Sequence, residues 1–106
     1  MAKYLITASY TAEGAKGVLK DGGTKRRQAA EAAIKSAGGK LEAFYFAFGE
    51  NDAFVLIDAP DHATVASASL AINASGAVRT KTVVLLTPEE IDQAIKKSTT
   101  YKAPGH

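Results

Sequence analysis

The chain has 106 residues and no cysteine, and its 13 basic and 11 acidic residues give a net charge of +2. This length fits one domain with one hydrophobic core, and the lack of cysteine excludes disulfide bonds and thiolate metal sites. The balanced charge differs from the strong basic excess of nucleic-acid-binding surfaces. No segment carries the roughly 20 apolar residues that span a bilayer, and the N-terminus lacks a signal-peptide pattern. We therefore expect a cytoplasmic protein with no membrane or nucleic-acid partner.

The N-terminal part of the chain predicts one strand followed by two helices. Residues 3–10 are rich in β-branched and aromatic side chains, which favours a strand. Thr11 can cap a short helix that runs to Lys20. Thr24 is positioned to cap a longer helix that runs to Ala37 and ends at a Gly-Gly pair.

A β-hairpin is predicted next, with strands at residues 40–48 and 53–59 and a connection at residues 49–52. Such a short connection joins antiparallel neighbours. Both strands are apolar on both faces, whereas a strand on a monomer's surface should alternate apolar and polar residues. Something besides the chain's own helices must cover the second face. In the first strand, one side carries Phe44, Phe46 and Phe48, and the other side carries Leu41, Ala43, Tyr45 and Ala47.

The second half of the chain predicts a helix, a strand and a final helix. Asp61 can cap a helix that runs to Ser75. The strand at residues 78–86 is polar at first and then fully apolar, so we expect its second half to be buried. The sequence Thr87-Pro88-Glu89-Glu90 is typical of a helix start, and a helix through Lys97 follows.

The predicted order β-α-β-β-α-β plus a final helix is that of a ferredoxin-like, split βαβ domain of the α+β class. Such a domain has a four-stranded antiparallel sheet with strands one and three in the centre and helices on one face. We expect the domain to span residues 1–97. Residues 98–106 have little apolar content, so this tail is expected to be mobile or to be strapped on a neighbouring subunit.

The apolar character of both hairpin faces predicts an oligomer. Helices cover one face, and an apolar patch of roughly several hundred Å² would remain on the other, which is rare for a monomer. Two sheets packed face to face would bury it, so the partner we expect is a second copy of the chain, in a homodimer or a higher oligomer. The predicted interface residues are Phe44, Phe46, Phe48 and Phe54.

Four residues are candidates for a ligand-binding or catalytic site. Asp52 ends the hairpin turn, where it can act as a base or a hydrogen-bond anchor, or can bond local backbone in the turn. Tyr45 can aim its hydroxyl into a cavity between sheets, or can be an ordinary buried tyrosine. Arg79 and Lys81 share one face of a strand, where they can hold an anionic ligand or protect an edge strand from aggregation.

The two histidines, His62 and His106, lie near a helix start and at the chain end. A metal site needs several convergent ligands, and a Ser-His-Asp triad needs an ordered histidine beside a serine and an acid. We therefore expect neither a metal site nor a catalytic triad, and no cofactor.

The order and spacing of several short motifs are similar to those of the GYD domain family, from about residue 4 to residue 95. The family takes its name from a Gly-x-Tyr-Asp turn, in which Asn51 stands at the tyrosine position here. The resemblance implies a fold of the dimeric α/β barrel group, and it brings no established activity. The matching motifs are Thr11-Ala-Glu-Gly14, Gly38-Gly39-Lys40, Phe44-Tyr45, Gly49-x-x-Asp52, Ala59-Pro60-Asp61, Gly76-Ala-Val78-Arg79-Thr80-Lys-Thr82 and Thr87-Pro-Glu-Glu90.

Two functional hypotheses follow. The first is a non-catalytic binding or assembly module, in which the space between two sheets holds a small apolar or weakly anionic molecule, or none. The second is a cofactor-independent isomerase or monooxygenase of the kind that other dimeric α/β barrels house, with Asp52, Tyr45 and Arg79 around a cavity. The lack of a convergent catalytic set favours the first hypothesis.

Overall fold

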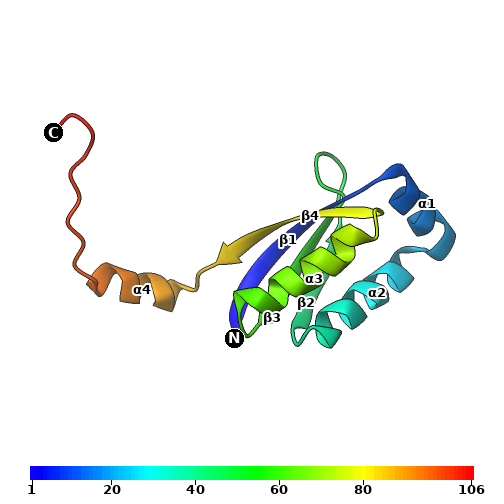
Figure 1. Ribbon diagram of the computed structural model, residues 1–106, viewed down its shortest axis with the longest axis horizontal. Helices are drawn as coiled ribbons and strands as arrows, with labels where there is room; N and C mark the ends of the chain where they lie inside the picture. Colours follow the sequence, from blue (N-terminus) through cyan, green and yellow to red (C-terminus); the bar gives the residue numbers. More distant parts are fainter.

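The computed structural model describes all residues 1–106. Four antiparallel strands form one sheet, and helices α2 and α3 lie side by side across one of its faces (Figure 1). The opposite face carries no helix. The elements in chain order are β1 (Ala2–Tyr10), α1 (Ala12–Asp21), α2 (Gly23–Ser36), β2 (Lys40–Phe46), β3 (Ala53–Ala59), α3 (His62–Ala74), β4 (Val78–Leu85) and α4 (Pro88–Lys96).

The strand order is β2-β3-β1-β4, with β1 and β3 in the centre and β2 and β4 at the edges. All neighbouring pairs are antiparallel. The prediction of an α+β domain with a split βαβ arrangement is therefore confirmed at the level of sheet topology, with a pair of helices in the place of the first crossover helix.

Three of the four helices begin at a residue whose side chain caps the helix. The hydroxyl of Thr11 accepts from the N–H of Gly14, and the carboxylate of Asp61 accepts from the N–H of Thr64, as the sequence predicts. The prediction that Thr24 caps α2 is wrong. Helix α1 continues to Asp21, so only Gly22 separates the two helices, and Gly22 takes the N-cap position with φ 84° and no side-chain bond. Glycine adopts positive φ without steric cost.

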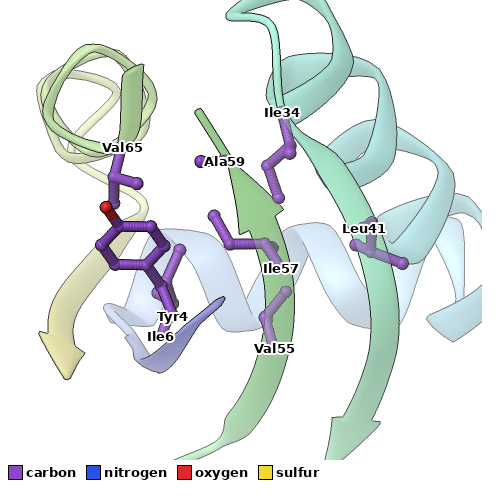
Figure 2. Close-up of a cluster of buried hydrophobic side chains, with 8 residues drawn as sticks. All are labelled: Tyr4, Ile6, Ile34, Leu41, Val55, Ile57, Ala59 and Val65. Atoms are coloured by element: carbon purple, nitrogen blue, oxygen red, sulfur yellow. The ribbon is translucent and has the colours of Figure 1, made fainter. Parts of the chain in front are cut away.

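The main core lies between the sheet and the helix layer. Figure 2 shows that its side chains come from β1, β2 and β3, together with Ile34 of α2 and Val65 of α3. Leu41 belongs to this core, although the simple alternation of residues places it on the face of Ala43 and Tyr45. A β-bulge between Leu41 and Ala43 inserts one extra residue and turns Leu41 toward the helices. The core residues are Tyr4, Ile6, Ile34, Leu41, Val55, Ile57, Ala59 and Val65.

The second half of β4 is not buried, which contradicts the sequence-based prediction. Val83 and Val84, which point to opposite faces of the sheet, are 50% and 49% exposed, and Leu86 is exposed as well. Val83 lies on the face that carries no helix, and Val84 lines a shallow hollow beside Val65 and Ala66 of α3, which cover it only in part. Beyond Val84 the chain leaves the helix layer and runs toward α4 (Figure 1).

Helix α4 and the tail project away from the sheet (Figure 1). The radius of gyration is 16.9 Å, whereas a compact domain of this length has about 13 Å. The predicted start of α4 is confirmed, because Thr87 and Glu90 form a complete capping box. No helix has the length and apolar content needed to cross a membrane.

Candidate functional site: the open face of the sheet

The face of the sheet that carries no helix, here called the open face, is organised in rows that run across the four strands. The register places one residue of each strand in a row, with neighbouring strands about 4.8 Å apart. One row mixes aromatic and polar residues, and the next is fully apolar. The first row is Tyr45, Phe54, Thr7 and Lys81, and the second is Ala43, Leu56, Leu5 and Val83.

Large apolar side chains are solvent-exposed in these rows. Tyr45 is 70% exposed and Phe54 is 37% exposed. Both residues belong to the hairpin of β2 and β3, which the sequence predicts to be apolar on both faces. Together with Val83 they form a continuous apolar band over all four strands, because Leu56 and Leu5 fill the positions between them. A contiguous exposed apolar patch, unlike a single exposed apolar residue, is typical of an interaction site.

An ion-pair cluster closes one end of the open face. The ammonium Nζ of Lys3 lies 3.0 Å from Oδ1 of Asp58 and also contacts the carboxylate of Glu42. Side-chain hydrogen bonds shared with Glu42 and Lys3 lower the pKa of Asp58, and hydrogen bonds donated to Glu42 and Asp58 raise the pKa of Lys3. The cluster joins β1, β2 and β3, and it gives this end of the face a polar rim.

A polar hollow of about 540 Å³ lies at the other end. Arg79 and Lys81 of β4 line it together with Glu50 and Asn51 of the hairpin turn. The two basic residues thus share one hollow, as their common strand face suggests, and an acidic residue of the turn faces the same hollow. The remaining lining residues are Thr7, Ser9, Asn73 and Thr80.

Asp52 anchors the hairpin to β1. Its Oδ2 accepts the backbone N–H of Tyr10 at 2.8 Å, and its own N–H donates to the carbonyl of Ala8 at 2.8 Å. The side chain therefore bonds backbone of a distant strand, rather than local backbone of the turn. Asp52 lines a different hollow from Arg79, and Tyr45 stands on the opposite edge strand from Arg79. Within one subunit, Asp52, Tyr45 and Arg79 therefore do not line a common cavity.

The four phenylalanines named as interface candidates lie in three places. Phe44 and Phe46 are on the helix-covered side, with ring centroids 5.1 Å apart, and Phe46 also approaches Tyr10 at 6.4 Å. Phe48 is fully exposed beside the hairpin turn. Only Phe54 lies on the open face, where it pairs with Tyr45 in the register.

Two polar contacts were not anticipated from the sequence. The amide of Asn73 at the end of α3 donates to Oγ1 of Thr80 at 2.7 Å and accepts the backbone N–H of Thr80 at 3.0 Å. The Tyr4 hydroxyl and Nδ1 of His62 form a hydrogen bond of 2.7 Å. Both contacts join a helix to the sheet, and no local motif marks them, because their partners meet only in the folded chain.

No group of three or more His, Cys, Asp or Glu side chains lies close enough to hold a metal ion. A family model of the GYD domain matches residues 4–95, from β1 to α4. No curated protein matches the chain. The family match spans most of the chain and includes all four strands that build the open face, so the chain belongs to the GYD domain family.

Proposed function

We propose that this protein is a binding and assembly module whose subunits pair through their open faces into a homodimer of the dimeric α/β barrel type. The observation that carries the proposal is the exposed apolar band of Tyr45, Phe54 and Val83. A two-fold contact places the same patch of both subunits together, so one apolar surface is self-complementary. Each subunit supplies the cover that the other lacks.

The sheet alone provides a small interface. Four strands about 4.8 Å apart and about eight residues long, at about 3.4 Å per residue, have a footprint of about 500 Å². A standard interface buries about 800 Å² on each partner. The C-terminal segment is the natural source of the additional area, because it projects from the domain (Figure 1). We therefore propose that α4 packs on the partner subunit.

The short length of α4 and its exposed apolar residues support this role. It has only nine residues, and isolated helices shorter than about 12 residues are marginally stable in water. Ile91 and Ile95 lie one turn apart on the same side of the helix, and both are exposed. A short helix with a complete capping box and an uncovered apolar stripe needs a surface to pack against.

The space between the paired sheets is the proposed site for a small apolar or weakly anionic molecule. Arg79 and Lys81 at the edge of the open face supply positive charge beside the apolar rows. The enzymatic alternative has no specific support, since Asp52 bonds to Tyr10 and stands apart from Tyr45 and Arg79.

The substitution Tyr45→Asp tests the dimer, because Tyr45 is 70% exposed in one subunit and its change leaves the subunit's core intact. Leu70→Asp is the matched control, since Leu70 is 73% exposed on α3. Light scattering coupled to size exclusion should give a dimer mass for the wild type and Leu70→Asp, and a monomer mass for Tyr45→Asp with an unchanged far-ultraviolet circular dichroism spectrum. A folded Tyr45→Asp variant with the dimer mass would contradict the proposal.

A further inference from the structure

An apolar cavity lies on the other side of the sheet, between the strands and the helix layer. Its volume is about 240 Å³, and 11 of its 14 lining residues are hydrophobic. The cavity exists because α2 presents Ala29, Ala30 and Ala33 toward the sheet, where longer side chains would fill the space. None of its lining residues belongs to the two rows of the open face.

One cationic side chain lines this apolar space. Arg26 stands near the start of α2, and no acidic residue is among the lining residues. The ion pairs of the chain involve only Lys3, so the guanidinium of Arg26 has no carboxylate partner. An arginine presents a planar fork of donors that matches a carboxylate, and such a pair is strongest where water is largely excluded.

Tyr10 lines the same cavity and lies close to Arg26. Burial raises the pKa of the Tyr10 hydroxyl, and the charge of Arg26 acts in the opposite direction. The hydroxyl therefore stays protonated at neutral pH and is a second donor near the guanidinium. A ligand with an apolar body and one anionic head fits this combination of a hydrophobic interior and two donors.

We propose that this cavity binds a small monocarboxylate, with the carboxylate paired to Arg26 and the apolar body packed between the alanines of α2 and the sheet residues Ile6 and Val55. An apolar cavity of about 150 Å³ is large enough for benzene, so the larger space here suits a ring or an aliphatic chain of roughly eight carbons. An occupant also restores the packing contacts that an empty apolar cavity lacks.

The first test compares octanoate with octan-1-ol, which share the apolar chain and differ in charge. In two-dimensional NMR titrations at neutral pH, we expect the wild type to bind octanoate at least about tenfold more tightly than octan-1-ol, as a charge-assisted hydrogen bond allows. Arg26→Gln should abolish that preference. Arg27→Gln is the matched control, because Arg27 is exposed on the same helix and does not line the cavity, and it should keep the preference.

The second test fills the cavity. Ala33→Leu places three additional carbon atoms in the space and should eliminate binding of both probes, whereas Ala32→Leu, at the neighbouring exposed position, should bind as the wild type does. Unchanged octanoate affinity in Arg26→Gln or in a folded Ala33→Leu variant would overturn the proposal. If Ala33→Leu does not fold, the Arg26→Gln comparison alone decides.

The site and the proposed dimer can be tested separately. Octanoate should bind the Tyr45→Asp variant with the affinity of the wild type, because Tyr45 does not line the cavity. Loss of binding in that variant alone would place the ligand between subunits, and this result would contradict a site beneath the helices. Failure of the dimer proposal would leave the prediction for Arg26→Gln unchanged.

Discussion

The backbone N–H of Tyr10 donates a hydrogen bond of 2.8 Å to Oδ2 of Asp52, which links the last residue of β1 to the residue before β3. A second bond, from the N–H of Asp52 to the carbonyl of Ala8, has the same length. Asp52 is the acidic residue of the turn motif that resembles the family signature, and in this fold it holds the hairpin against the central strand. Its geometry indicates a structural anchor.

Asp52→Ala should therefore lower stability. The substitution leaves the half-buried N–H of Tyr10 without its acceptor, and an unsatisfied donor of this kind costs about 1–3 kcal/mol. Urea denaturation at pH 7 measures the loss in the free energy of unfolding. Glu50→Gln, at an exposed position of the same turn, should stay within about 0.5 kcal/mol of the wild type. Equal stabilities of the two variants would show that the Tyr10 bond contributes nothing.

The ion-pair cluster of Lys3, Glu42 and Asp58 predicts a pH dependence. The pKa of Asp58 is lowered below 3.8 in the folded chain, so its contribution to stability is present above the unfolded pKa and is lost as the pH falls through the folded value. The pKa of Lys3 is raised above 10.5, so its contribution is present below the unfolded pKa and is lost as the pH rises through the folded value.

Lys3→Met removes the cation of this cluster. Its urea midpoint should lie below that of the wild type at pH 7, and the two midpoints should converge as the carboxylates are protonated below about pH 4. Lys16→Met, which changes an exposed lysine of α1 outside any ion pair, should follow the wild type across the range. A constant difference between Lys3→Met and the wild type from pH 3 to pH 7 would rule out the ionic explanation.

Local signals in the sequence predict most elements of the fold. The caps Thr11, Asp61 and Thr87 each mark a helix start, and the structure confirms all three. The exception is Thr24, because α1 continues to Asp21 and Gly22, with φ 84°, both ends α1 and begins α2. A cap motif is therefore misleading where a preceding glycine already takes the cap position.

The faces of the strands are harder to predict. Both faces of the hairpin are apolar, so the pattern alone cannot decide which one the helices cover. The bulge beside Leu41 has no marker in the sequence, and it reverses the orientation of that side chain. The apolar end of β4 predicts burial, but Val83 lies on the face without helices and α3 covers Val84 only in part. The cavity beside Arg26 was also missed, because it depends on the distance between the sheet and an alanine-rich helix.

Two glycines of α1 should respond in opposite ways to alanine. A methyl group at Gly14 would overlap the carbonyl oxygen of Ala77, whereas a methyl group at Gly17 meets nothing within 4 Å. Gly14→Ala should lower the free energy of unfolding by about 1–3 kcal/mol through overpacking. Gly17→Ala should raise it by up to about 1 kcal/mol, since alanine is the better helix former. Thermal and urea denaturation measure both, and a stabilised Gly14→Ala variant would disprove the close contact.

The proposed contact of α4 with a partner subunit predicts that its apolar stripe contributes to dimer stability. Changing Ile91 and Ile95 together to aspartate removes the stripe while leaving the capping box at Thr87 intact. Because two exposed aliphatic side chains each lose part of a burial energy of about 1.5–3 kcal/mol, the dissociation constant of the dimer should rise at least about tenfold, as measured by sedimentation equilibrium. Gln93→Asp adds one negative charge, compared with two in the double variant, at another exposed position of the helix, and it should leave the dissociation constant within about twofold of the wild type. If both variants weaken the dimer equally, added charge accounts for the effect and the apolar stripe has no part in the contact.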